Sequence, residues 1–277
     1  MAPDARLVAI GDNCIDVYVQ TGERLVGGNA VNVAVQWARS GRASAYVGAV
    51  GADADGARVT QALAAAGVAV GGVRIMLGAT GVTEVELRDD GERVLAHEDF
   101  GVSADLRLDD DDVDVHATAA WAHCVTLPGF RRVARRFADH GVPVSFDFST
   151  RFEFADLGDL QVAFYSCADD DLDAARSVVS DAVSGGARIA VATCGAAGSV
   201  ACWSADGAGS AFVPAVEVDV IDTLGAGDSY AARFVTARLQ GAEVPEAMQT
   251  AALAAAVTCG HRGAWPQPLA AVRERSA

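Results

Sequence analysis

The sequence contains no lysine, and all 21 of its basic residues are arginine. Without an ε-amino group the chain cannot use a phosphate-binding loop that ends in lysine, the strand lysine of protein kinases, or a Schiff-base intermediate. Any chemistry on phosphate must therefore rely on backbone N–H groups and on arginine.

Other shortages narrow the class of protein further. Only 6% of the residues are aromatic, and the six cysteines and five histidines show no metal-ligand spacing. No apolar run reaches the ~18 residues of a membrane span. The 37 acidic residues give a formal charge of −16, which repels nucleic acid and anionic lipid, so we expect neither as a partner. Because the first apolar run, 7–10, is too short for a signal peptide, we expect a cytoplasmic protein.

Hydrophobic periodicity predicts strands that alternate with helices. The strands are expected at about 6–11, 43–50, 68–76, 118–125, 142–147, 161–165 and 187–193, and the helices at about 30–39, 55–66, 128–140, 170–184, 226–240 and 245–259. Two further strands, 198–203 and 210–213, are expected to form an antiparallel edge. This order predicts a three-layer α/β fold with a mostly parallel central sheet, in one domain over 1–277, and places ligands at the carboxyl ends of the strands.

The segment 81–97 interrupts this alternation. Its residues alternate between polar and apolar on both sides of a turn at Asp89–Gly91, which is typical of a half-buried hairpin. A second alternating segment, 15–20, is a suitable partner for it. We therefore expect a small separate sheet that forms a lid, built from about 14–26 and 73–100.

Two acidic runs, Asp109–Asp112 and Asp169–Asp171, each precede a helical pattern. Carboxylates at that position accept hydrogen bonds from free N–H groups and favour the positive end of the helix. Both runs are therefore expected to cap helices, and the second also stands at the end of a predicted central strand.

The most informative segment is Asp222–Ser229, with the sequence DTLGAGDS, directly before a predicted helix. Gly225 and Gly227 on either side of Ala226 let the backbone approach a ligand, and the helix start directs N–H groups at an anion. Asp228 could then act as a general base on a substrate hydroxyl. The same pattern also fits a glycine-rich turn with a capping aspartate.

Carboxylates and amides also cluster near the N-terminus, in 11–16 and 27–32. Aspartate accepts hydrogen bonds from hydroxyl groups, and asparagine both donates and accepts, so the clusters suit a ligand with many hydroxyl groups. Each cluster alone is also compatible with ordinary loop residues.

In combination these segments resemble the PfkB/ribokinase family of sugar kinases over essentially the whole chain. The stretch 28–32, GNAVN, is similar to the family's N-terminal signature, and 222–228, DTLGAGD, to its C-terminal one. The resemblance implies a ribokinase-like fold. It also implies that Asp228 is the catalytic base, with the N–H groups of Ala226, Gly227 and Asp228, next to Gly225, as the anion hole.

The resemblance further implies where the two substrates bind. The acceptor sugar would contact Asp16, Gly28, Asn29 and Asn32, with Asp12 as a weaker candidate. The nucleotide would lie along Thr193, Gly195 and Gly198, with Thr223 nearby and the adenine beside 252–260. Asp147 and Arg151 are similar to the family's Asp and Arg at a neighbouring strand end, where Arg151 would neutralise phosphate charge in place of lysine.

The metal segment departs from the family, which carries an Asn and, three residues later, a Glu around the hydrated Mg²⁺. Here the stretch 166–170 reads SCADD. Because Mg²⁺ keeps much of its water, Ser166 with Asp169 or Asp170 is the candidate set for Mg²⁺ with ATP. Asp222, with Thr223, is a candidate for a monovalent cation such as K⁺, as in some relatives.

These resemblances imply transfer of the ATP γ-phosphoryl group to a primary hydroxyl of a ketose-type sugar derivative. The stretches 11–18, 27–33 and 263–265 are closest to the branch of the family that acts on the 6-hydroxyl of fructoselysine. Other open interpretations are a kinase for fructose, ribose or a nucleoside, and a non-catalytic sugar or nucleotide sensor. A nucleoside is less expected, because the lid offers only Tyr18 and Phe100 for stacking. A homodimer through the lid is a further possibility that the family suggests.

Overall fold

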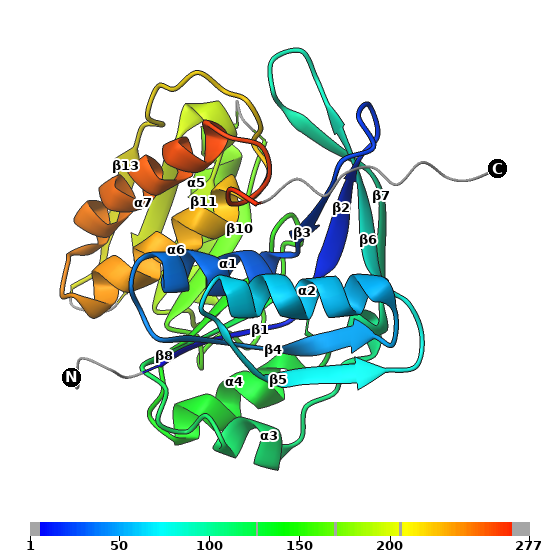
Figure 1. The fold of residues 1–277 in the computed structure, drawn as a ribbon. Coiled ribbons are helices and arrows are strands. Elements are labelled where there is room, and N and C mark those ends of the chain that lie inside the picture. The colour runs from blue at the N-terminus through cyan, green and yellow to red at the C-terminus, as the bar shows by residue number, and fades with distance from the viewer. Residues whose placement is uncertain (1–5, 126, 169–170, 205–206, 268–277) are drawn as a thin grey trace.

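Nine strands form the central sheet of the structure, a computed structural model that describes residues 6–125, 127–168, 171–204 and 207–267 (Figure 1). Their spatial order is β13 (Gly209–Val213), β12 (Ser199–Trp203), β11 (Ile189–Thr193), β10 (Val162–Ser166), β9 (Val144–Asp147), β8 (Trp121–Val125), β1 (Leu7–Ile10), β4 (Ser44–Gly51) and β5 (Ala69–Met76). All neighbours from β11 to β5 pair in parallel, whereas β12 and β13 form an antiparallel edge. The expected sheet and edge are confirmed.

Helices cover both faces of this sheet, which confirms the three-layer prediction. One face carries α1 (Asn29–Arg39), α2 (Ala54–Ala65), α6 (Ala226–Leu239) and α7 (Val244–Cys259), and the other carries α3 (Asp110–Asp114), α4 (Phe130–Asp139) and α5 (Leu172–Ser184). Two single turns of 3₁₀ helix, Val102–Asp105 and Gly195–Ala197, each connect a strand to the next element of the chain. Each face has its own apolar core, because strands that are covered on both sides bury both sets of side chains.

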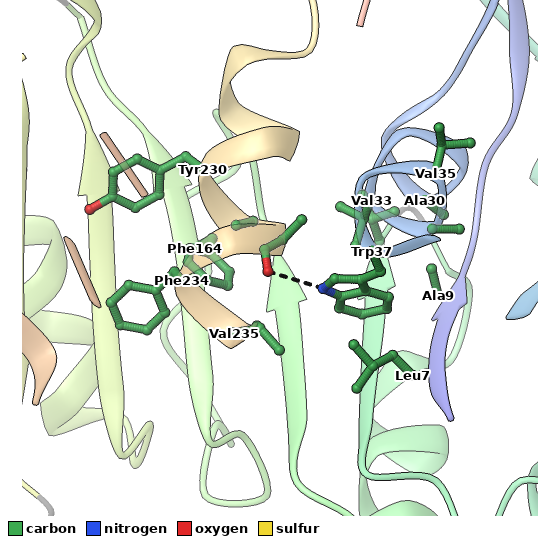
Figure 2. Close-up of a cluster of buried hydrophobic side chains, with 14 of the residues drawn as sticks. Leu7, Ala9, Ala30, Val33, Val35, Trp37, Phe164, Tyr230, Phe234 and Val235 are labelled. Atoms are coloured by element: carbon green, nitrogen blue, oxygen red, sulfur yellow. Dashed lines mark hydrogen bonds between the residues drawn. The ribbon is translucent and has the colours of Figure 1, made fainter. Parts of the chain in front are cut away.

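The core under α1 and α6 fixes the two helices that begin at the site. Trp37 of α1 is fully buried and donates its indole N–H to the Ala232 carbonyl of α6, 3.0 Å away (Figure 2). Phe234 of α6 packs edge-on against Phe164 of β10. The N-terminal ends of α1 and α6 are therefore held in a fixed relation to each other and to the sheet.

A second, four-stranded sheet stands apart from the first, with the order β3 (Arg24–Gly27), β2 (Cys14–Tyr18), β6 (Thr80–Leu87) and β7 (Arg93–Gly101). The expected hairpin and its pairing with the N-terminal segment are present, since β2 pairs with β6 in parallel. The expected boundary at residue 73 is wrong, because β5 runs parallel to β4 and places 73–76 in the central sheet. Val73 packs there against the main core.

Both acidic runs cap helices where the structure describes them. Asp109 accepts the Asp112 N–H at the start of α3 in a reciprocal capping box, and Asp171 accepts the Ala174 N–H at the start of α5. Asp169 and Asp170 lie outside the described residues. None of the helices seen in the described part of the chain has the length and apolarity needed to span a bilayer.

Candidate active site

A cavity of about 380 Å³ lies between the small sheet and the carboxyl ends of the central strands. Most of the residues that the sequence analysis assigned to acceptor and catalysis line it, from segments far apart in the chain. They are Asp12, Asp16, Gly28, Asn29, Asn32, Gly225, Gly227 and Asp228, and Asp147, Arg151 and Ser166 line it as well. The cavity therefore joins the starts of α1 and α6 at one place.

The two helix starts meet through one hydrogen bond. Asn32, in the first turn of α1, donates its amide Nδ2–H to Asp228 Oδ2 in the first turn of α6, at 2.6 Å. Asn32 is 3% exposed, and its own Oδ1 has no partner among the described residues. Because such a buried acceptor costs free energy unless it is satisfied, it is suited to receive a hydrogen bond from a bound hydroxyl group.

The electrostatic surroundings of Asp228 suit a general base. Burial raises its pKa to about 7, and the carboxylates of Asp147 and Asp12 add to the rise. The hydrogen bond from Asn32 and the guanidinium group of Arg93 act in the opposite direction, because both stabilise the charged form. With a pKa near neutrality, a substantial fraction of the carboxylate is ionised at pH 7, and this ionised form is basic enough to take a proton from a hydroxyl group.

Fewer N–H groups are available at the start of α6 than the expected anion hole would use. The Ala226 N–H donates to the Thr223 carbonyl at 3.2 Å, and Ala226 does not line the cavity. The N–H groups of Gly227 and Asp228 have no acceptor among the described residues, as is normal for the first turn of a helix. The prediction for Ala226 is thus wrong, since a turn closes on its N–H, and the N–H groups of the next two residues remain available.

Gly225 and Gly227 have different physical roles. Gly225 has φ 78°, and a Cβ there would lie 2.3 Å from the Ala264 Cβ, so backbone conformation and packing both require glycine. A Cβ on Gly227 would meet nothing within 4 Å. Open space beside Gly227, next to free N–H groups, is the arrangement that a bound anion requires.

Asp16 faces the cavity from β2 of the small sheet. It is 3% exposed and lies 3.2 Å from the Cys14 thiol, which donates to Oδ1. Burial raises its pKa to about 7, and the nearby Asp222 carboxylate contributes. A Cβ on Gly27 would lie 1.9 Å from Asp16 Oδ2, so this glycine makes room for the carboxylate.

The side chains of Asp12 and Asn29 both make hydrogen bonds to other groups of the protein. Asp12 accepts the N–H groups of Asn29 and Ala30, at 3.4 and 3.2 Å, and so caps α1. The Asn29 amide donates to Asp147 Oδ2 at 2.6 Å. Burial raises the pKa of both Asp12 and Asp147. The structural role of Asp12 agrees with its place as the weaker acceptor candidate.

Asp222 connects the small sheet to the catalytic loop. Its fully buried carboxylate accepts hydrogen bonds from the Tyr18 hydroxyl, the Leu224 N–H and the Gly263 N–H. Leu224 packs with Tyr18, Leu25 and Val85 in a small core of their own. These contacts explain why an aspartate stands here, and a role in binding K⁺ stays a prediction.

Arg93 was not identified from the sequence. It begins β7, lines the cavity, and donates from Nη1 to the Thr223 carbonyl at 3.4 Å, while its backbone N–H donates to Thr223 Oγ1. Its Nε is buried without a partner among the described residues. Its position in the sequence could have identified it. In a chain without lysine, an arginine directly after the hairpin turn carries one of the few positive charges near the lid.

The expected nucleotide loop, 193–198, follows β11, and none of its residues lines the cavity. Gly195 and Gly198 have φ 46° and 108°, and a Cβ on Gly198 would lie 2.3 Å from the Val213 carbonyl oxygen. Thr223 lies at the lid, where its hydroxyl contacts Glu92. Of the Mg²⁺ candidates, only Ser166 is described, and the described residues contain no group of three His, Cys, Asp or Glu side chains that could hold a metal ion.

Comparison with known proteins identifies the class of protein. A model of the pfkB family of carbohydrate kinases matches residues 5–123 and 152–269. The chain belongs to this family and is an ATP-dependent phosphotransferase. Ribokinase of Arabidopsis thaliana, solved with ribose and ATP, shares the fold with a TM-score of 0.80 and 23% identity, over 94% of each chain.

Two curated relatives are more similar in sequence. Fructoselysine 6-kinase of Shigella flexneri is 36% identical over 270 residues, which are 94% of this chain and 99% of the relative. Fructosamine kinase FrlD of Bacillus subtilis is 33% identical over 267 residues, which are 94% of this chain and 93% of the relative. The similarity therefore extends over nearly the full length of each protein.

The two loop glycines give a matched pair of variants. Gly227→Ala should leave the free energy of unfolding unchanged and reduce kcat about 100-fold, because the methyl group occupies the space beside the free N–H groups. Gly225→Ala should destabilise the protein by about 2 kcal/mol or more through strain and the clash with Ala264. Urea unfolding and steady-state kinetics measure both. Full activity in Gly227→Ala would contradict the assigned anion hole.

The pH dependence of kcat/KM should report the ionisation of Asp228. Activity should rise with pH through about 7, as the base loses its proton. Asn32→Leu removes the hydrogen bond that favours the charged form, so the midpoint should move up by about one pH unit. Asp16→Asn is the control, because Asp16 also has a raised pKa but is not the base. A midpoint that moves only in the control would assign the profile to Asp16.

Proposed function

We propose that this protein is an ATP-dependent kinase that phosphorylates a primary hydroxyl of a ketose-type sugar bearing an amine, with the 6-hydroxyl of fructoselysine as the preferred acceptor. The observation that carries the proposal is Asp228, held by Asn32 inside the cavity and next to the free N–H groups that begin α6. The two relatives that match over nearly their full length are named for fructoselysine and for fructosamine, and these names support the choice of acceptor.

In the proposed reaction Asp228 takes the proton from the attacking hydroxyl group, and the free N–H groups of Gly227 and Asp228 stabilise the negative charge on the phosphoryl group in transit. Arg93 and Arg151 line the same cavity and supply the positive charge that lysine provides elsewhere. The role of the small sheet is to close over the cavity and exclude water.

The polar groups of the cavity suit the hydroxyl groups of a sugar. Asn32 Oδ1 is buried without a partner among the described residues and accepts from one hydroxyl. Asp16, also buried, accepts from another while its carboxylate is ionised. Asn29 contributes an amide N–H as a donor. These groups come from the N-terminal segments that were expected to bind the acceptor.

The charge of the cavity favours an acceptor with a cationic group. Its lining includes six carboxylates and two guanidinium groups. Glu98 and Asp99 are exposed on β7 at the rim, and the Glu98 carboxylate has no hydrogen-bond partner in the part of the chain that the structure describes. We assign the ammonium group of fructoselysine to this rim, where a carboxylate pairs with it without full desolvation.

The nucleotide is placed beside the cavity, between the loop after β11 and α7. Leu253 and Val257 stand one helical turn apart on α7 and are 55% and 71% exposed, which leaves an apolar face for a purine ring. Kinases of this family use ATP with Mg²⁺, and the oxygen donors at this end of the cavity suit that hard cation. Ser166 would help to hold its water shell, and Mg²⁺ would neutralise charge on the phosphates when bound.

The alternative acceptors are less well supported. Tyr18 directs its hydroxyl to Asp222, so of the two lid aromatics only Phe100 lines the cavity, and a nucleoside base lacks a second stacking partner among the described lid residues. The presence of Asp228 in the cavity favours a catalyst over a sensor. A domain that spans 1–277 and a homodimer through the lid stay predictions.

An acceptor screen tests the proposed function directly. ADP release should be measured with fructoselysine, fructose, ribose and adenosine at equal concentrations, with Mg²⁺ and ATP. We expect kcat/KM for fructoselysine to exceed that for fructose by about fivefold, since a charged group that pairs at an exposed rim contributes about 1 kcal/mol. Equal turnover of fructoselysine and fructose would contradict a role for the amine in recognition. No turnover of any of the four acceptors would contradict the proposed kinase activity.

Glu98→Gln tests the assignment of the rim. It should raise KM for fructoselysine about threefold to fivefold and leave KM for fructose unchanged, because only the first carries an ammonium group. Glu84→Gln is the matched control: Glu84 is also exposed on the small sheet but does not line the cavity. Equal effects of the two variants would show that overall charge, and not Glu98, attracts the substrate.

A further inference from the structure

Three fully or nearly buried polar side chains lie under the acceptor end of the cavity, and the mechanism does not use them. Trp121 and His123 are on β8, and Ser145 is on the adjacent β9, opposite His123 in the register. Their exposed fractions are 4%, 0% and 0%. The rings of Trp37 and Phe164 pack against the His123 ring, with centroids 6.3 and 6.1 Å away, and hold its plane.

Hydrogen bonds join these side chains to the cavity. Trp121 Nε1 and His123 Nδ1 each lie 2.8 Å from Ser145 Oγ. On the other side of the ring, His123 Nε2 lies 3.5 Å from Asn29 Oδ1. Asn29 Nδ2 then donates to Asp147 Oδ2 at 2.6 Å. The chain of contacts thus runs from the core to two residues that line the cavity.

The chemistry of the end groups sets the direction of every bond. An indole N–H can only donate, so Ser145 Oγ accepts from Trp121. Among the described residues the buried Ser145 Oγ has no partner besides Trp121 and His123, so its hydroxyl hydrogen is satisfied only when His123 Nδ1 accepts it. The imidazole proton is therefore on Nε2 and points to Asn29 Oδ1. If the imidazole proton were on Nδ1, Asn29 would have to turn its NH₂ group to His123 and its Oδ1 to the Asp147 carboxylate. Two acceptors would then face each other at the 2.6 Å separation that Asn29 Nδ2 and Asp147 Oδ2 have in the structure.

We propose that Trp121, Ser145 and His123 form a one-directional relay that fixes the side-chain amide of Asn29, so that its NH₂ group faces Asp147 and the acceptor. His123 is in this sense a positioning residue. Asn29 then offers the acceptor a donor and not an oxygen, which selects a substrate oxygen at that place. Burial lowers the pKa of His123 to about 3, so the ring stays neutral throughout the range in which the enzyme would work.

The tautomer of His123 is measurable without any substrate. In protein labelled with ¹⁵N in the histidine rings, the structure predicts that His123 carries its proton on Nε2 at pH 7.5, and the loss of that signal in His123→Leu assigns it. In Ser145→Ala the Nδ1 acceptor loses its donor and only the contact with Asn29 still favours Nε2–H, so a measurable fraction of the Nδ1-protonated tautomer should appear. A wild-type ring protonated on Nδ1 would overturn the proposal.

Kinetics separate positioning from a merely structural role, and this arm rests on the proposed function for its acceptor. His123→Leu should raise KM for fructoselysine about tenfold and change KM for ATP less than about twofold. His123→Gln, whose amide N–H reaches toward the position of Nε2–H, should restore most of the acceptor affinity. Equal changes in both KM values, or no rescue by glutamine, would contradict the relay. If fructoselysine is not turned over, the proposed function fails, and the tautomer still decides the relay.

Discussion

The site depends on keeping a carboxylate usable inside a cavity that already contains other carboxylates. Asp228 shares that space with Asp12, Asp16 and Asp147, so burial and repulsion both favour its protonated form. The Asn32 amide and the Arg93 guanidinium work against this. The balance places the pKa of Asp228 near neutrality, where a base is effective. Each of the opposing groups comes from a different element, so the fold as a whole sets the reactivity of one side chain.

The segment around Asp228 performs two tasks in seven residues. Its second half, from Gly225, provides the free N–H groups and the proposed base. Its first half attaches the loop to the small sheet, because Asp222 binds the Tyr18 hydroxyl and Leu224 packs against Leu25. If the small sheet moves, these contacts would carry the movement to the loop that would hold the phosphoryl group. A lid with this connection can assemble the site when it closes, and not only cover it.

The sequence was sufficient for the architecture because strands and helices alternate with strong periodicity. It also pointed to Asp228 and Asn32, which line one cavity, because both stand in local motifs; their roles stay predictions. The sequence did not reveal contacts between segments that are distant in the chain. His123 reaches Ser145 because β8 pairs with β9, and Arg93 of β7 reaches Thr223 because the loop before α6 lies against the small sheet. The error for Ala226 was also local in origin: a motif shows that N–H groups face outward but not which of them a turn consumes. The lid boundary was wrong because it overlapped the strand expected at 68–76, and the structure places that strand, as β5, in the central sheet beside β4.

The most direct test of the central claim is Asp228→Asn, which keeps the shape of the side chain but removes its ability to accept a proton. Calorimetry with a non-hydrolysable ATP analogue should give a dissociation constant within about twofold of the wild type, while kcat for the acceptor falls by about 10²- to 10⁴-fold. Turnover close to the wild-type rate would contradict the account, because some other group would then be removing the proton.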